Sequence, residues 1–226
     1  MQRLLLIGGL DPSGGAGVTL DAAVASLHGL QPLPVAALLT VQSQRGFVEA
    51  KAVDEGFLRA QIDAVLADGP VHAVKLGLLV EPELAAFVAD VVEALPAHVP
   101  LVVDPVLSAT TGGLAPSAEL LQIYRERLGP RAALLTPNLP ELALLWQGDP
   151  QRALDDGAGA VLVKGGHGEG MQSEDVLWNR SGQHRSRRPR LDIGLVRGTG
   201  CALATAVAAR LVRGADLEQA CVQAGE

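Results

Sequence analysis

Short apolar runs alternate along the chain with longer segments in which apolar residues recur every three or four positions. Apolar runs of about four to eight residues are typical of buried strands, and the longer spacing is typical of amphipathic helices. Their alternation predicts stacked βαβ units and a mainly parallel sheet. The predicted strands are residues 4–8, 35–41, 73–76, 101–103, 132–135 and 160–163. The predicted helices are residues 16–30, 55–67, 82–95, 117–128 and 140–146.

Two polar segments, 176–178 and 184–190, predict an antiparallel hairpin at one edge of this sheet. Pro189 and the basic side chains of the second segment discourage pairing with a further strand, so this edge is expected to face solvent. The chain contains no linker-like or low-complexity stretch and no repeat of fixed period. We therefore expect residues 1–226 to fold as a single α/β domain.

Composition narrows the class of protein. A chain of 226 residues that is 48% hydrophobic can bury a large core, and a net charge of −7 argues against nucleic-acid binding. The two cysteines form neither a disulfide framework nor a zinc-binding pattern. The N-terminal apolar run, residues 4–7, is too short for a signal peptide or a membrane span. We expect a cytoplasmic protein with a small-molecule substrate and no nucleic-acid or membrane partner. An exposed sheet edge and helices rich in Ala, Leu and Val favour a homo-oligomer, a dimer first.

The segment Gly198-Thr199-Gly200-Cys201 predicts a tight turn that opens a helix, since an Ala-rich run follows at 202–211. Free N–H groups and the positive dipole end of a helix N-terminus attract an anion. In this field the pKa of a cysteine thiol falls from its usual value of about 8.5, whereas a bound anion raises it, so the charge of Cys201 stays open. The turn is therefore a candidate site of phosphoryl chemistry.

A glycine-rich loop, residues 11–17, follows the first predicted strand and matches neither the Walker A nor the dinucleotide-binding pattern. Glycines alone predict only a strand–helix turn. The loop and the helix after it also carry Asp11, Ser13 and Asp21, and this polarity favours a small polar ligand.

The next two predicted strands end in polar side chains. Gln42 carries a donor and an acceptor in one plane, so it can pair with the edge of an amino-substituted heteroaromatic ring, or simply be a solvated loop residue. Lys75 lies in the third strand and can be catalytic, but a structural role is favoured, in which its amine extends to solvent or pairs with a carboxylate.

Three later strands end in polar residues that suit phosphoryl transfer together: Asp104, Asn138 with Glu141, and Lys164. Each has a simpler interpretation, because Asp104 precedes a proline, Asn138 and Glu141 have the spacing of a capping box, and Lys164 can be a surface lysine. As a set they supply carboxylates for a magnesium ion and a lysine for phosphate charge, which is what phosphoryl transfer requires.

Taken in order, these segments resemble the hydroxymethylpyrimidine/phosphomethylpyrimidine kinases of thiamine biosynthesis, a branch of the ribokinase-like superfamily. The resemblance spans nearly the whole chain. It implies a three-layer α/β/α fold and ATP-dependent phosphorylation of 4-amino-5-hydroxymethyl-2-methylpyrimidine and then of its monophosphate. The motifs that carry it are Asp11-Pro12-Ser13-Gly14-Gly15-Ala16-Gly17, Gln42 with Arg45-Gly46, Lys75-Leu76-Gly77, Asp104-Pro105-Val106, Thr136-Pro137-Asn138-Leu139-Pro140-Glu141, Lys164-Gly165-Gly166-His167 and Gly198-Thr199-Gly200-Cys201.

The resemblance also implies roles for individual residues. Three residues would hold the aminopyrimidine: Gly9, Asp21 and Gln42. Asp104 and Glu141 would organise Mg²⁺, and Asn138 and Lys164 would face the ATP phosphates. The four residues of the anion-binding turn would be catalytic, with Cys201 as the base: Gly198, Thr199, Gly200 and Cys201.

The chain departs from the family pattern in three places. Arg197 stands where the family usually has histidine, and it either adds a charge for phosphate binding or replaces a packing contact. Thr110 stands where a lysine is frequent. The sequence stops at Glu226, earlier than usual, which is expected to affect nucleotide affinity more than phosphoryl chemistry. Two alternative functions stay open: a pyridoxal kinase of the same superfamily, and a non-catalytic pyrimidine-binding protein.

Overall fold

The computed structural model describes residues 1–43, 45–107, 115–165, 172–189 and 196–225. Its strands are β1 (Arg3–Leu10), β2 (Gln31–Ser43), β3 (Gly46–Ala52), β4 (Ala73–Leu76), β5 (Leu101–Val103), β6 (Leu134–Leu135), β7 (Ala160–Val163), β8 (Gln172–Asn179) and β9 (Gly182–Pro189). Its helices are α1 (Gly17–Leu27), α2 (Glu55–Ala67), α3 (Pro82–Ala94), α4 (Ala118–Ile123), the π-helical turn η1 (Tyr124–Leu128), α5 (Gly129–Arg131), α6 (Leu139–Trp146), α7 (Pro150–Asp155), α8 (Thr199–Val212) and α9 (Leu217–Ala224). Five residues mentioned above lie outside this description: Thr110, Gly166, His167, Arg190 and Glu226.

Within the described ranges the strands form one nine-stranded sheet in the order β3-β2-β1-β4-β5-β6-β7-β8-β9. The six strands from β2 to β7 in this order run parallel, as the alternating pattern predicts. The β8–β9 hairpin is antiparallel to β7, which confirms the predicted antiparallel edge. The opposite edge is antiparallel as well, because β3 folds back on β2.

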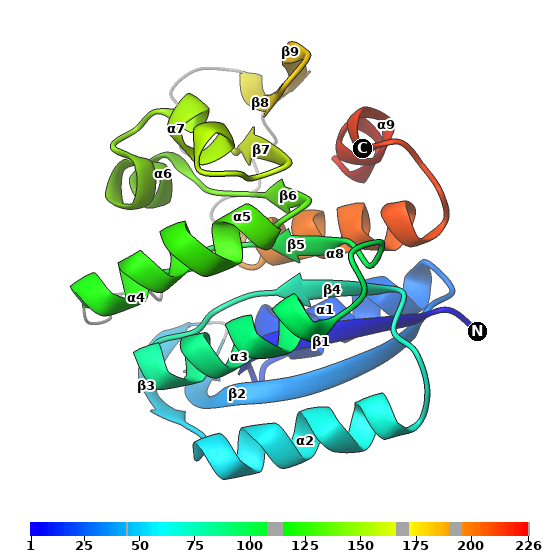
Figure 1. The fold of residues 1–226 in the computed structure, drawn as a ribbon, viewed down its shortest axis with the longest axis vertical. Coiled ribbons are helices and arrows are strands. Elements are labelled where there is room, and N and C mark those ends of the chain that lie inside the picture. The colour runs from blue at the N-terminus through cyan, green and yellow to red at the C-terminus, as the bar shows by residue number, and fades with distance from the viewer. Residues whose placement is uncertain (44, 108–114, 166–171, 190–195, 226) are drawn as a thin grey trace.

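Helices cover both faces of the sheet (Figure 1). Leu5 and Ile7 of β1 belong to the larger core, which the helices from α2 to α7 share with one face of the sheet. Leu4 and Leu6 belong to the smaller core on the other face, under α1, α8 and α9. Successive side chains of a strand point to opposite faces, so a strand buried on both sides reads as a continuous apolar run. The layers confirm the predicted three-layer α/β/α fold.

Three elements escape the sequence pattern. β3 is an edge strand whose side chains are mostly exposed, so its apolar signal is faint. α7 and α9 have six and eight residues, too few for a clear helical repeat. The helix expected at 117–128 begins at α4 and changes to the π-helical turn η1, and the strand expected at 132–135 is reduced to β6.

The carboxyl ends of the parallel strands lie at one edge of the sheet, which is where open α/β sheets bind ligands. The loop to α1 follows β1, Asp104 follows β5, Thr136 follows β6 and Lys164 follows β7. The N-terminus of α8 lies at the same edge, because Gly198 packs against the backbone of Gly15. In the described part of the chain, no helix has the length and apolar character that a membrane span requires.

Candidate active site

Asp104 and Lys164 form a buried ion pair at the carboxyl edge of the sheet. The Nζ atom of Lys164 lies 2.6 Å from Oδ1 of Asp104, and the hydroxyl of Thr136 donates to the same oxygen at 3.1 Å. Burial alone raises the pKa of Asp104, but the ammonium groups of Lys164 and Lys75 outweigh it and hold that pKa below its usual range. Asp104 is therefore a carboxylate at neutral pH, within reach of the lysine predicted to face phosphate.

The second carboxylate oxygen of Asp104, Oδ2, is buried and lacks a hydrogen-bond partner among the described residues. A Cβ atom added to Gly200 would lie 3.8 Å from it and 3.0 Å from Nζ of Lys164, so the first turn of α8 packs directly against the ion pair. An unpartnered buried oxygen of this kind costs free energy unless a ligand or water satisfies it.

Gly198 shapes the turn that precedes α8. Its φ of 76° is left-handed, and a side chain there would collide with the carbonyl oxygen of Gly15 and with Leu20. Only glycine therefore lets the turn lie against the first loop. No side chain among the described residues caps this helix, so within that part of the chain the N–H groups of Thr199, Gly200 and the residue after it are available to bind an anion.

Cys201 is in the first turn of α8 and is partly exposed. Burial raises the pKa of its thiol, the Lys75 ammonium and the N–H of Gly17 lower it, and the carboxylates of Asp104 and Asp21 raise it further. The net direction is upward, so the protein without ligand carries a neutral thiol at this position. The favourable field of the helix N-terminus is thus outweighed here.

Lys75 and Asp21 form a second buried ion pair below the turn. Nζ of Lys75 lies 2.7 Å from Oδ2 of Asp21, and Thr205 donates its hydroxyl to Oδ1 at 2.8 Å. Burial opposes the charge of Lys75, but Asp21 holds the pKa of Lys75 above its usual range. Of the roles that the sequence leaves open for Lys75, pairing with a carboxylate is confirmed. Asp21 is only 1% exposed and both of its oxygens are occupied, so it supports the site through Lys75 and Thr205 rather than offering a free carboxylate.

Gln42 lies beside the first loop. Its Nε2 donates to Oδ2 of Asp11 at 2.9 Å, while Oδ1 of Asp11 accepts from the N–H and the hydroxyl of Ser13. The amide plane of Gln42 is thus fixed by the loop. Gly9 lies at the foot of this loop, where a Cβ at position 17 would collide with its carbonyl oxygen. The structure therefore brings Gly9 and Gln42 to the same end of the sheet.

Asn138 and Glu141 form the capping box of α6. The N–H of Glu141 donates to Oδ1 of Asn138 and the N–H of Asn138 donates to Oε2 of Glu141, both at 2.8 Å. The capping interpretation is confirmed, and it leaves Oε1 of Glu141 for another partner. Burial and the charge of Asp104 raise the pKa of Glu141 to about 7, against the lowering effects of Lys164 and Asn138.

The donor set fits Mg²⁺. The described residues contain no cluster of three or more His, Cys, Asp or Glu side chains, so a zinc-like cage is absent there. Mg²⁺ keeps most of its waters and is usually held by one or two carboxylates and by substrate phosphates. The unpartnered Oδ2 of Asp104 and the nearby Glu141 match this requirement.

Two supporting residues had no sequence prediction. The hydroxyl of Thr136 donates to Asp104. Thr136 directly follows β6, so, like Asp104 and Lys164, it is a polar residue at the end of a parallel strand. Asp175 of β8 accepts the N–H of Gly165 at 2.9 Å and thereby fixes the backbone next to Lys164. Asp175 lies in a polar hairpin with no local motif, so only the tertiary pairing of β7 and β8 brings it to Lys164.

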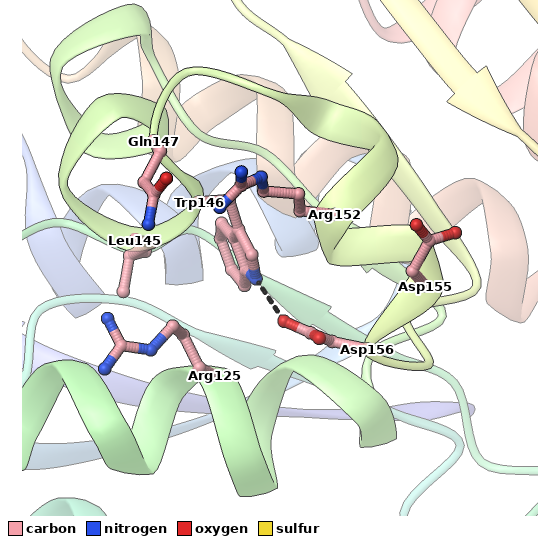
Figure 2. A pocket seen from close by; sticks show the side chains of 7 residues that line it. All are labelled: Arg125, Leu145, Trp146, Gln147, Arg152, Asp155 and Asp156. Carbon is pink, nitrogen blue, oxygen red and sulfur yellow. Dashed lines mark hydrogen bonds between the residues drawn. The ribbon is translucent and has the colours of Figure 1, made fainter.

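A groove of about 460 Å³ lies away from these strand ends (Figure 2). It is formed by η1, the end of α6 and α7, and Trp146 in it donates its Nε1–H to Asp156 at 3.1 Å. The groove contains none of the residues predicted for the site. Its lining residues are Arg125, Leu145, Trp146, Gln147, Arg152, Asp155 and Asp156.

Comparison with known proteins agrees with the geometry. The phosphomethylpyrimidine kinase family matches residues 11–226. The hydroxymethylpyrimidine/phosphomethylpyrimidine kinase of Escherichia coli is 35% identical over 222 residues, covering 92% of this chain and 83% of that protein. The protein of the same name from Mycobacterium bovis is 38% identical over 225 residues, covering 94% and 81%.

Solved structures have the same fold. Phosphomethylpyrimidine kinase from Clostridium difficile superposes with a TM-score of 0.83 at 27% identity, covering 100% of this chain and 96% of that one. The ADP complex of Bacillus subtilis pyridoxal kinase gives a TM-score of 0.88 at 25% identity, covering 99% and 88%. With the family matched over residues 11–226 and relatives at 35% and 38% identity along most of its length, the chain belongs to the phosphomethylpyrimidine kinase family.

Proposed function

We propose that the protein transfers the γ-phosphoryl group of ATP to the hydroxymethyl group of 4-amino-5-hydroxymethyl-2-methylpyrimidine, and then phosphorylates the monophosphate to the pyrophosphate used to build thiamine. One observation carries this proposal: the Asp104–Lys164 pair lies against Gly200 in the uncapped first turn of α8. A lysine, an ionised carboxylate and a ring of free N–H groups in one place provide the positioning and charge neutralisation on which phosphoryl transfer depends.

Phosphate binding is assigned to Lys164, Asn138 and the α8 turn. Lys164 is fixed by Asp104 on one side and by its N–H to Pro137 carbonyl bond of 3.0 Å on the other. In this proposal the N–H groups of Thr199, Gly200 and Cys201 donate to the oxygens on which charge develops during transfer. The side-chain amide of Asn138 contributes a neutral donor, its Nδ2, since its Oδ1 already accepts in the capping box.

Asp104 and Glu141 are the residues that would hold Mg²⁺. A bound Mg²⁺ supplies charge neutralisation of the ATP phosphates. The protein contributes Oδ2 of Asp104, which lacks another partner, and Glu141, whose raised pKa falls when a cation binds beside it. Lys164 and the first turn of α8 lie beside Asp104 and orient the phosphates from there.

The substrate ring is assigned to the Gln42 side of the site. The amide of Gln42, fixed by Asp11, presents its Oε1, which has no donor among the described residues, to the amino group of the pyrimidine. Gly9 permits close approach at the foot of the loop, and Asp21 supports this wall through Lys75 and Thr205. The hydroxymethyl group then lies toward Cys201, whose sulfur is the candidate proton acceptor.

A pyridoxal kinase is the second candidate, and the structural similarity to B. subtilis pyridoxal kinase favours it. A coupled assay of ADP release with the aminopyrimidine, pyridoxal and ribose in parallel separates the candidates. We expect turnover with the aminopyrimidine and its monophosphate. Preferred turnover of pyridoxal would replace the assignment, and calorimetric binding of the pyrimidine without turnover of any substrate would leave only a binding protein.

A dimer and a cytoplasmic location complete the proposal. Leu39, Val41 and Val48 are exposed on β2 and β3 at the antiparallel edge, together with Phe57 at the start of α2. Covering this apolar surface with a second copy removes it from water. Light scattering after gel filtration tests the dimer: a dimeric wild type and a monomeric Val48→Glu variant support it, and a monomeric wild type contradicts it. Cell fractionation tests the location.

A further inference from the structure

Arg197 differs from the other cations at the carboxyl edge of the sheet because, among the described residues, it has no carboxylate partner. Lys75 is paired with Asp21 at 2.7 Å and Lys164 with Asp104 at 2.6 Å, so each lysine is neutralised by its partner. The guanidinium of Arg197 donates to the backbone carbonyl oxygen of Ser43 at 2.6 Å, and no ion pair of Arg197 occurs among the described residues. Within the described part of the chain, its positive charge is therefore not engaged by a carboxylate.

The position of Arg197 joins the two halves of the site. It directly precedes Gly198, the left-handed residue that opens the α8 turn. Its partner Ser43 directly follows Gln42, which is fixed by Asp11. The guanidinium thus lies between the phosphate-binding turn and the residue assigned to the substrate ring, and it is only partly exposed.

The two substrates of the proposed function differ in charge by one phosphate group. The alcohol is neutral, whereas a phosphate monoester carries about −1.5 to −2 at pH 7. Lys164 is assigned to the ATP phosphates and Lys75 is buried against Asp21, so neither lysine is assigned to the phosphate of the monophosphate. Arginine suits this task because its planar fork binds phosphate with two parallel hydrogen bonds and stays charged when partly buried.

We propose that Arg197 is the residue that adapts this site to a phosphorylated substrate: its guanidinium binds the phosphate of the pyrimidine monophosphate and takes no part in binding the alcohol. This inference rests on the proposed function and adds a specificity contact to the same site. The hydrogen bond to Ser43 holds the guanidinium on the Gln42 side of the site. The remaining N–H groups of the guanidinium donate to the phosphate when the monophosphate binds.

Steady-state kinetics with both substrates test the proposal in wild type, Arg197→Gln and Arg197→Lys. Arg180→Gln is the matched control, because Arg180 is an exposed arginine in the turn between β8 and β9, beside the amino end of β7. We expect Arg197→Gln to lower kcat/KM for the monophosphate about 10- to 100-fold and that for the alcohol less than about 3-fold. Arg197→Lys restores part of the loss, and Arg180→Gln changes neither value.

An equal loss of kcat/KM with both substrates, or no loss with the monophosphate, would overturn the proposal. Arg197 would then serve only to connect Ser43 to the turn before α8. Calorimetric titration with the monophosphate in the absence of ATP measures binding alone, independently of turnover. Tighter binding to wild type than to Arg197→Gln supports the role of Arg197 even if wild type phosphorylates neither substrate, a result that would reject the proposed function alone. A thermal melt of each variant shows that it is folded.

Discussion

Gly200 leaves room for the amine of Lys164, since a Cβ at position 200 would lie only 3.0 Å from Nζ. The amine has little freedom to withdraw, because it is held 2.6 Å from Asp104. Glycine is therefore needed at position 200 for the close approach of a charged group. At Gly198, in contrast, it is needed for a left-handed backbone.

Gly200→Ala is expected to lower activity without lowering stability. The new methyl group displaces Lys164 or the turn, and we expect kcat to fall about 10- to 100-fold, as for loss of a positioned charge. Alanine also favours the helix over glycine by up to about 1 kcal/mol, so the free energy of unfolding is expected to stay level or rise. Parallel kinetics and urea unfolding check this. A variant with wild-type kcat contradicts the contact between the turn and Lys164.

Lys75→Met is expected to be strongly destabilising. It leaves Asp21 buried without its cation, and breaking a buried pair in this way costs about 3–5 kcal/mol. The double variant Lys75→Met/Asp21→Leu is expected to recover part of that loss, because no unpaired charge remains. Glu55→Gln, which removes a partner of an exposed ion pair on α2, serves as the control and is expected to cost less than about 1 kcal/mol. Urea unfolding measures all three, and a single variant no less stable than the double variant refutes the account.

Most of the fold could be predicted because the buried strands are continuous apolar runs. A parallel strand covered on both faces has no polar side, so β1, β4, β5 and β7 stand out in the sequence. The edge strand β3 does not stand out. A continuous apolar run reflects burial rather than an intrinsic preference of the residues for strands, and β3 is mostly exposed. The π-helical turn η1 has no sequence signature that distinguishes it from the helix on either side.

The site could be predicted only as far as strand ends reveal it. Asp104 and Lys164 each follow a recognisable strand, and the common edge of parallel strands brings them together. The partners Thr205 and Asp175 come from other elements and meet the site through tertiary packing alone. The charge state of Cys201 also escaped prediction, because the helix dipole visible in the sequence opposes a desolvation that depends on the packed structure.

Glu141 makes stability depend on pH. Its pKa rises from 4.5 to about 7 on folding, so the folded protein binds this proton more tightly than the unfolded chain does between these values. Its contribution is fully present below pH 4.5 and is lost as pH rises through about 7, on the order of 3 kcal/mol in total. Urea unfolding in EDTA across this range measures the decline. Glu141→Gln, which keeps the capping box, is expected to flatten it, whereas the exposed Glu119→Gln is not. Equal slopes in wild type and Glu141→Gln reject this origin.

Cys201 provides the sharpest test of the chemistry. Its thiol is neutral in the free protein because burial raises its pKa, so a role as base predicts a kcat that rises with pH as the thiolate forms. Cys201→Ala is expected to lower kcat about 100-fold for both phosphorylations and to remove this alkaline limb. Cys201→Ser keeps the size of the group but not its acidity, and is expected to resemble the alanine variant. If kcat of Cys201→Ala stays near wild type with both substrates, the N–H groups of the α8 turn are sufficient, and the sulfur serves only to pack against Gly17.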